Sequence, residues 1–318
     1  MVMKHDYNEQ DIFNSNPAFL KALLIDHTTK KNIIWATNNY IRKGYFENKN
    51  IYYENLIGKN NPIKSRVFKS KIEQSKRAKD MAEVFTSSWV CNKQNNLIDE
   101  HWFGYKGAFN IEQGFGWITT EKVVFYNKSW KEYVEDIRLE ITCGEAPYLV
   151  SRYDVVTGEK IELKNRIGLL DRKFRVVQEN ASNDEWLEYS LKALKSIYGY
   201  EYQGDNLLIA RQNIFFTFID NYLEKYSKLP DDSILFDVIN IITWNIWQMD
   251  GIKMVVPLSC HEEEIVQLSL FDDKPAKGEF CRGCKEDNVL KHNGIRCIIM
   301  DWEKNKTIKF LSLMKGVI

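Results

Sequence analysis

The sequence predicts an α/β protein whose strands form a largely parallel sheet. Helix-like and strand-like segments alternate along the second half of the chain, an order typical of parallel strands joined by helices. Acidic residues stand where several of these strands end, and parallel sheets bind ligands at the carboxyl ends of their strands. Hydrophobic residues make up 44% of the 318 residues, which is typical of a folded chain with a large core.

Composition excludes several classes of protein. The formal net charge is zero, so any attraction to nucleic acid must come from a local patch. No apolar run is long enough to span a bilayer, and the first residues, "MVMKHDYNEQ", lack the apolar centre of a signal peptide. Four of the six cysteines fall in the last fifth of the chain, which indicates a reduced compartment with one metal site. We therefore expect a cytoplasmic protein with no membrane partner.

The first part of the chain is expected to be an N-terminal extension, residues 1–75, ahead of a domain at 76–318. It contains a strand-like piece at 31–40 and a basic segment from Lys64 to Lys79 with a single glutamate. Such a run is either a solvated helix face or a surface that contacts phosphates. On the second interpretation the contacts to DNA would come from Lys64, Arg66, Lys69, Lys71, Lys76 and Arg77.

The elements of the main domain follow from apolar periodicity and turn residues. Residues 81–98 predict a loop and then a helix, with Ser87 or Ser88 as N-cap. Glycines and aromatic residues at 107–127 indicate short strands and turns. The following segments are expected to be a helix and strand over 130–142, a helix and strand over 184–201, a helix over 205–226, a helix and strand over 233–251, a polar insertion over 257–297, and a last strand over 294–303.

Three motifs stand near the expected strand ends, in a fixed order. They are "EITCGEAPYL" at 140–149, "IYGYE" at 197–201 with "ARQN" shortly after it, and "NIWQMDGI" at 245–252. An earlier segment, "AEVFTSS" at 82–88, stands before the first expected helix of the domain. Together they resemble the adenine-specific DNA methyltransferases that act as modification subunits of restriction systems.

The resemblance implies a Rossmann-like methyltransferase sheet that binds S-adenosylmethionine and acts on DNA. The residues that match the cofactor motifs are Phe85, Thr86, Glu140, Cys143, Gly144, Glu201 and Asp250. In this interpretation Glu201 accepts hydrogen bonds from the ribose hydroxyls, and Asp250 accepts one from the adenine of the cofactor. A glycine at 144 lets the backbone approach the methionine part closely.

The catalytic end of the chain departs from the family pattern. Asp301 and Trp302, in "IIMDWE", stand where the family has a polar residue, two prolines and an aromatic residue, and both prolines are absent. Few residues follow, so the sheet is expected to be incomplete at its C-terminal end. Two interpretations stay open: Asp301 and Trp302 receive the target adenine, or the chain is a catalytically inactive component that binds DNA or protein. A restriction or specificity subunit is the partner that the resemblance implies.

The insertion at 257–297 has the ligand types of a zinc site. A Cys-x-x-Cys pair with further ligands on either side suits tetrahedral zinc. The expected ligands are Cys260, Cys281, Cys284 and Cys297, with His292 or His261 as substitutes. Such a zinc ion would be structural, since the insertion is too polar to fold by burial alone.

A pentapeptide inside the insertion, "QLSLF", lies between acidic flanks. It is similar to the peptide by which many bacterial DNA-processing proteins bind the replicative sliding clamp. The clamp-binding residues would be Gln267, Leu268, Leu270 and Phe271. The alternative is that these apolar residues form a short strand of the protein's own core.

Overall fold

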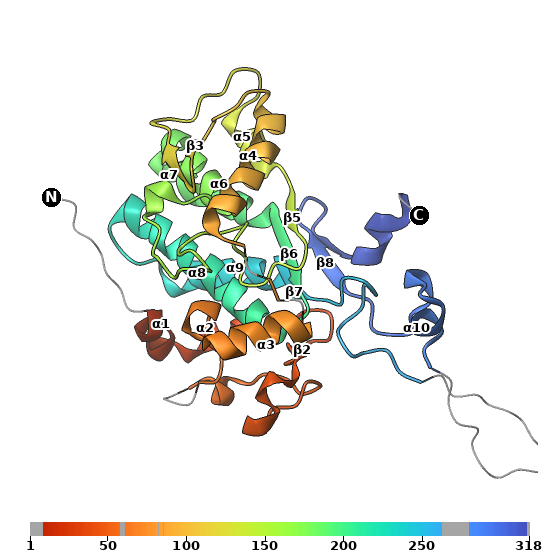
Figure 1. Cartoon of the computed structure of the whole chain (residues 1–318). Coiled ribbons are helices and arrows are strands. Elements are labelled where there is room, and N and C mark those ends of the chain that lie inside the picture. The colour runs from red at the N-terminus through yellow and green to blue at the C-terminus, as the bar shows by residue number, and fades with distance from the viewer. Residues whose placement is uncertain (1–8, 58–60, 82, 85, 263–279, 317–318) are drawn as a thin grey trace, which may run out of the picture.

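The computed structural model describes residues 9–57, 61–81, 83–84, 86–262 and 280–316 (Figure 1). The fold is mixed α/β, with small sheets and longer helices. The helices are α1 (Glu9–Ser15), α2 (Pro17–Leu23), α3 (Lys71–Met81), α4 (Ser88–Phe103), α5 (Trp130–Glu135), α6 (Leu169–Asn180), α7 (Asn183–Lys195), α8 (Gly204–Tyr226), α9 (Asp232–Asn245) and α10 (Arg282–Glu286). The strands are β1 (Ile25–Asp26), β2 (Lys31–Asn32), β3 (Asn110–Gln113), β4 (Gly116–Thr119), β5 (Arg138–Glu140), β6 (Ile197–Glu201), β7 (Ile246–Gln248), β8 (Ile298–Asp301) and β9 (Lys306–Lys309). Within the described ranges, no helix has both the length and the apolar character needed to cross a bilayer.

The parallel part of the predicted sheet is present. Strands β5, β6 and β7 form a three-stranded sheet in that order, and both pairs are parallel. Helices α6 and α7 connect β5 to β6, and α8 and α9 connect β6 to β7. The sheet therefore has the strand–helix–strand connections that the sequence predicts, and its three carboxyl ends lie along one edge.

The last predicted strand does not join this sheet. Strand β8 pairs antiparallel with β9 in a separate hairpin, with Ile299 opposite Ile308. The expectation of a single, largely parallel sheet that includes 294–303 is therefore wrong. The physical reason is the alternating segment Lys306–Lys309, which follows a four-residue turn and offers β8 a partner close in sequence.

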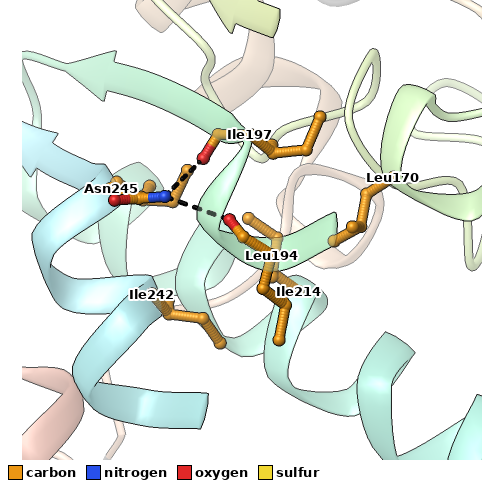
Figure 2. Close-up of a pocket in the computed structure, with 7 residues that line it drawn as sticks. Leu170, Leu194, Ile197, Ile214, Ile242 and Asn245 are labelled. Carbon is orange, nitrogen blue, oxygen red and sulfur yellow. Dashed lines mark hydrogen bonds between the residues drawn. The ribbon is translucent and has the colours of Figure 1, made fainter. Parts of the chain in front are cut away.

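One face of the parallel sheet packs against helices. Helix α8 is 23 residues long and buries most of its side chains, including Phe215, Phe216 and Phe218. A small apolar cavity lies between β6 and β7 of the sheet and helices α6, α7, α8 and α9 (Figure 2). Its single polar side chain, Asn245, donates hydrogen bonds to the carbonyl groups of Leu194 and Ile197, 3.0 Å each. The cavity of about 10 Å³ has space for about one water molecule, so it is a packing defect and not a ligand site.

The other face of the sheet packs against the C-terminal part of the chain. A second apolar cluster joins Tyr198, Tyr200, Trp247 and Met249 of the sheet region to Val256, Cys297, Ile299 and Phe310. The hydroxyl of Tyr198 also donates a hydrogen bond of 3.0 Å to the carbonyl oxygen of Met300. Two separate apolar clusters therefore cover the two faces of one small sheet.

The N-terminal region is not a separate extension. Ile12, Phe13, Leu23 and Trp35 are buried in the same apolar cluster as the phenylalanines of α8, and the ring of Phe13 lies 5.3 Å from that of Phe216. The boundary expected at residue 75 therefore does not separate two packing units. The segment holding α1, α2, β1 and β2 completes the helical side of the core.

The two outer strands of the parallel sheet, β5 and β7, differ in how far other parts of the chain cover their free sides. At β7 the carbonyl oxygen of Ile246 accepts a hydrogen bond from Arg211 Nε (2.8 Å), and Cys297 Sγ lies 3.5 Å from the carbonyl oxygen of Gln248. The Gln248 side chain also bonds to both backbone groups of Ile34, at 2.8 Å each. The edge at β7 is thus covered by other parts of the chain, whereas β5 forms the opposite edge.

Candidate cofactor site and candidate metal centre

The carboxyl edge of the parallel sheet carries the three acids that the sequence singles out. Glu140 ends β5, Glu201 ends β6, and Asp250 follows β7 after one further residue. The strands are neighbours in the sheet, so these acids lie along one edge. The loop 141–146 that contains Cys143 and Gly144 follows β5 at the same edge.

Glu201 holds this loop against the sheet. Its Oε2 accepts a hydrogen bond from the Gly144 backbone N–H (2.9 Å), and its Oε1 accepts one from the Gln203 N–H (3.0 Å). Gly144 has a φ of +56°, a backbone conformation that favours glycine. The side chain of Glu201 is buried, and burial raises its pKa to about 6.

Cys143 fixes the base of the same loop. Its backbone N–H donates a 2.9 Å hydrogen bond to the carbonyl oxygen of Tyr200. Its side chain is buried beside Gly199 of β6, where a Cβ would lie 3.4 Å from Cys143 Sγ. Burial raises the pKa of the Cys143 thiol well above its ordinary value, so the thiol is a packing group and not a nucleophile.

Glu140 has one carboxyl oxygen, Oε2, that is buried and has no hydrogen-bond partner among the described residues. Burial is the main cause that raises the pKa of Glu140 well above its ordinary value. The charge of Glu201 adds to this rise, and the backbone N–H groups of Tyr148 and Leu149 oppose it. A buried polar atom without a partner is costly, so this atom is a candidate contact for a bound polar ligand.

The segment before α4 lies against this edge as well. The side chains of Thr86 and Cys91 both influence the pKa of Tyr148, so the three side chains are neighbours, and Cys91 Sγ donates to the carbonyl oxygen of Thr86 (3.5 Å). Burial, and after it the charge of Glu140, raises the pKa of the Cys91 thiol, so Glu140 lies near Cys91. Thr86 is therefore brought together with Glu140, as the motif order implies, whereas Phe85 lies outside the described residues. Neither Cys91 nor Tyr148 is among the residues predicted from the motifs, although Tyr148 stands inside the motif at 140–149 and Cys91 three residues after the one at 82–88.

Asp250 has a local role. Its Oδ1 accepts hydrogen bonds from the backbone N–H groups of Ile252 and Lys253, at 3.1 and 3.0 Å. Its other oxygen lies 3.8 Å from Lys253 Nζ. The carboxylate thus caps its own turn, which accounts for this acid without a ligand.

Asp301 and Trp302 lie near the amino ends of the sheet strands, on the side opposite to the carboxyl ends that carry Glu140 and Glu201. Trp302 Nε1 donates a 2.7 Å hydrogen bond to Asn245 Oδ1, and Lys195 Nζ lies 5.2 Å from the centre of the Trp302 ring. Asn245 and Lys195 come just before the amino ends of β7 and β6. Asp301 itself accepts a hydrogen bond from the Lys304 N–H (3.0 Å). The structure does not bring this pair together with Glu201, because β8 runs from the carboxyl edge, where Arg296 bridges Val255, toward the amino edge.

The basic segment contributes fewer exposed charges than its sequence suggests. Lys64, Lys71 and Lys76 are exposed, whereas Lys69 and Arg77 are buried. Arg77 Nη1 lies 2.8 Å from Asp205 Oδ2, and Lys69 Nζ lies 3.8 Å from the same oxygen. The assignment of Lys69 and Arg77 to DNA phosphates is therefore wrong.

Arg66 has a different role within this segment. It is half-buried, and its backbone N–H donates a 2.6 Å hydrogen bond to Glu145 Oε1. Its described contact thus connects the basic segment to the loop after β5. The three exposed lysines stay candidates for contact with a phosphate backbone.

Three cysteines and one histidine form a compact group at the base of the C-terminal insertion. The ligand atoms of Cys260, Cys281, Cys284 and His292 all lie within 4.8 Å of one another. His292 Nδ1 is 3.7 Å from the sulfur of Cys260, 3.7 Å from that of Cys281 and 3.6 Å from that of Cys284. In a tetrahedral zinc site the sulfur-to-nitrogen separation is roughly 3.5 Å, given zinc–sulfur and zinc–nitrogen bonds of about 2.3 and 2.05 Å. This Cys₃His group could hold a metal such as zinc.

Backbone N–H groups beside the cluster favour the thiolate form of Cys281, which is the form that binds a cation. Burial opposes ionisation of Cys281, but the backbone N–H groups of Asn293 and Cys284, together with His292, lower the pKa of its thiol to about 6. The Asn293 nitrogen lies 3.3 Å from Cys281 Sγ. Donors of this kind stabilise a thiolate and orient it toward a metal.

The fourth ligand differs from the first choice made from sequence. Cys297 is buried in the second apolar cluster, with its sulfur against the carbonyl of Gln248, and it does not belong to the group. His292, a substitute in the sequence analysis, takes that place. His261, the other substitute, is exposed, and its backbone N–H donates to Asn293 Oδ1 (3.2 Å).

Substitution of Gly283 by alanine is expected to weaken metal binding about 10–100-fold, the range found when the surroundings of metal ligands are disturbed. A Cβ on Gly283 would lie 2.4 Å from the backbone nitrogen of His292 and 2.6 Å from its Nδ1. Competition against a coloured zinc chelator measures the loss. Gly116→Ala, where the nearest atom to a new Cβ is 3.7 Å away, should bind metal like the unmodified chain. Equal affinity in both variants would contradict the described packing around His292.

The clamp-binding residues Gln267, Leu268, Leu270 and Phe271 lie outside the described residues. Their proposed role stays a prediction.

Comparisons of the chain with protein-family models, with curated proteins and with solved structures found no match. Any function must therefore be argued from the two sites.

Proposed function

We propose that the chain binds S-adenosylmethionine at the carboxyl edge of the β5–β6–β7 sheet and serves as an adenine-specific DNA methyltransferase or its modification subunit. The observation that supports this most is the convergence of three separate segments on one edge: Thr86 with Tyr148, the loop at Gly144, and Glu201. These segments carry the motifs that resemble the methyltransferase family, in the same order along the chain.

The residues present fit the polar groups of such a cofactor. Glu201 would accept hydrogen bonds from the ribose hydroxyls, using the lone pairs that its two backbone donors leave open. Glu140 Oε2, which has no partner, would be satisfied by an amino group of the ligand. Gly144 would allow the ligand to approach the loop backbone. When bound, the cofactor supplies an electrophilic methyl group, and the Glu201 carboxylate favours its positive charge.

A second function is favoured by the position of Asp301 and Trp302. These residues contact the turn at Lys304 and the residue before β7, so they are not available to an adenine held near Glu201. The chain would then be a methyltransferase-like component that binds cofactor, DNA or protein without methylating by itself. A restriction or specificity subunit would supply the missing catalytic loop. In both functions the Cys₃His group holds zinc in a structural role.

Calorimetric titration of the full chain with S-adenosylmethionine tests the cofactor site. Glu201→Gln is expected to lower the affinity about tenfold to a hundredfold, because each charge-assisted hydrogen bond contributes about 1.5–3 kcal/mol. Glu303→Gln, at an exposed position of the β8–β9 turn, should leave the affinity unchanged. Failure of the unmodified chain to bind would refute the proposed cofactor site.

Transfer of a labelled methyl group from the cofactor to adenine-containing DNA then separates the two functions. Binding together with transfer supports the methyltransferase. Binding without transfer supports the component that needs a partner subunit.

The affinity is also expected to rise as pH increases from about 5 to about 7. Burial raises the pKa of Glu201 to about 6, so the carboxylate form that accepts two hydrogen bonds becomes dominant only above that pH. Titrations at several pH values check this. In Glu201→Gln the rise should disappear, and any dependence that persists reports on Glu140.

A further inference from the structure

The outer edge of β5 is open, in contrast to the covered edge at β7. The Arg138 N–H bonds to the carbonyl oxygen of Ser196 beside β6 (2.9 Å). Because backbone groups alternate in direction along a strand, those of Leu139 and its neighbours Ile137 and Ile141 point away from β6. Within the described part of the chain, the N–H groups of Leu139 and Ile141 donate no hydrogen bond.

Three branched apolar side chains line this edge on one face of the sheet. Ile137 is 70% exposed, Leu139 44% and Ile141 64%. Natural edge strands are protected from pairing by proline, by bulges or by charged side chains. The segment 137–141, "IRLEI", has no proline and no bulge, and its two charged side chains lie on the opposite face of the sheet from the three apolar ones. This is an edge suited to pairing with another strand.

The same five residues are complementary to themselves. In an antiparallel pair centred on Leu139, Ile137 would lie opposite Ile141 of the other copy, and Leu139 opposite Leu139. Arg138, which pairs with Asp136 of its own chain, would lie opposite Glu140, so no like charges would face each other across the pair. Branched apolar residues are favourable cross-strand pairs.

We propose that two copies of this chain associate through β5, edge to edge and antiparallel, to form one continuous six-stranded sheet with a twofold axis at Leu139. Each copy would satisfy the outward backbone groups of the other. The carboxyl edges of the two halves would point in opposite directions, so each copy keeps its own Glu201 site. This assembly does not depend on the proposed cofactor or on methyl transfer.

Sedimentation velocity over a wide range of protein concentration tests the assembly. The unmodified chain is expected to sediment as a dimer. Leu139→Lys and Ile141→Lys should sediment as monomers, because each places a charge beside the axis, and like charges then face an apolar surface or each other. Both positions are exposed in the single chain, so the variants should keep its circular dichroism spectrum. Ile118→Lys is the matched control, since Ile118 is a 56% exposed strand residue of β4, and it should stay dimeric.

A cysteine at the axis tests the register. Residue 139 would form a hydrogen-bonded pair with itself, with Cα atoms about 5.5 Å apart, which is a separation that a disulfide can span. Oxidised glutathione should therefore link Leu139→Cys into a covalent dimer, while Ile118→Cys and the unmodified chain, which share the native cysteines, stay uncrosslinked. A monomer at every concentration would overturn the proposal. So would a dimer that Leu139→Lys leaves intact, and pairing with an unrelated strand would appear as association only in the presence of another protein.

Discussion

Replacement of Cys281 by serine is expected to abolish stoichiometric metal binding and to unfold the segment around α10, while the helical core stays folded. Cys281 is the most buried of the three thiols in the group. The cluster joins Cys260, in the segment after β7, to His292, in the segment before β8. It therefore closes a loop of 32 residues in sequence separation. Binding of structural zinc stabilises such segments by on the order of 10 kcal/mol.

Elemental analysis and hydrogen exchange measure the two parts of this result. The unmodified chain should contain one zinc per molecule, and chelation should raise exchange in α10 and the β8–β9 hairpin but not in α8. Cys297→Ala is the matched control, because Cys297 is a neighbouring buried cysteine outside the group. Its metal content should be unchanged. Loss of metal from Cys297→Ala, or retention in Cys281→Ser, would show that the described ligand set is wrong.

The second large effect is expected at Asp205. Asp205→Asn should destabilise the protein by about 3–5 kcal/mol, the cost of leaving buried charges uncompensated. Asp205 is fully buried at the start of α8, where it contacts Arg77 and Lys69 and accepts a 2.7 Å hydrogen bond from Tyr40. Because Glu83 still pairs with Arg77 and neutralises part of the buried positive charge, we expect a loss of stability at the lower end of this range.

Urea denaturation of Asp205→Asn measures the change in unfolding free energy. The control is Lys106→Ala, which removes an ion pair with Glu100 at a side chain that is 83% exposed, and it should change stability by less than about 1 kcal/mol. Equal effects in the two variants would contradict the role given to the network. Although burial opposes it, Arg77 and Lys69 hold the pKa of Asp205 below its ordinary value. The stabilisation is therefore present above the ordinary carboxyl pKa and is lost as pH falls through the lower folded-state value.

The sequence predicts the parallel sheet well because its signals are local. Each of β5, β6 and β7 is a short segment with an acid at its end or two residues after it, and helices separate them. The hairpin was missed because "IIMD" looks the same whether its partner is parallel or antiparallel. That partner, "KTIK", comes after Asp301, the acid at which the sequence predicts the sheet to end.

Long-range pairing explains the other differences. Nothing near Arg77 in sequence shows that Asp205 will neutralise it, so a basic run cannot be divided into surface and core residues by composition. The position of Cys297 could have been predicted. It stands two residues before Ile299, and residues two apart lie on the same face of a strand. If Ile299 faces the apolar core, Cys297 is expected to be buried on that face as well, as the structure shows.

Both faces of the parallel sheet are covered by apolar residues, and this affects how the chain folds while it is being synthesised. A ribosome releases β6 and β7 long before Phe310, yet Tyr200 and Trp247 pack against that phenylalanine, with ring centres 6.0 and 5.2 Å away. Until the segment around Phe310 emerges, the nascent chain therefore exposes the apolar face of β6 and β7. The Cys₃His group, which could hold a metal such as zinc, lies in the segment between β7 and Phe310. We expect cells starved of zinc to accumulate this polypeptide as aggregates, although its helical half is already complete.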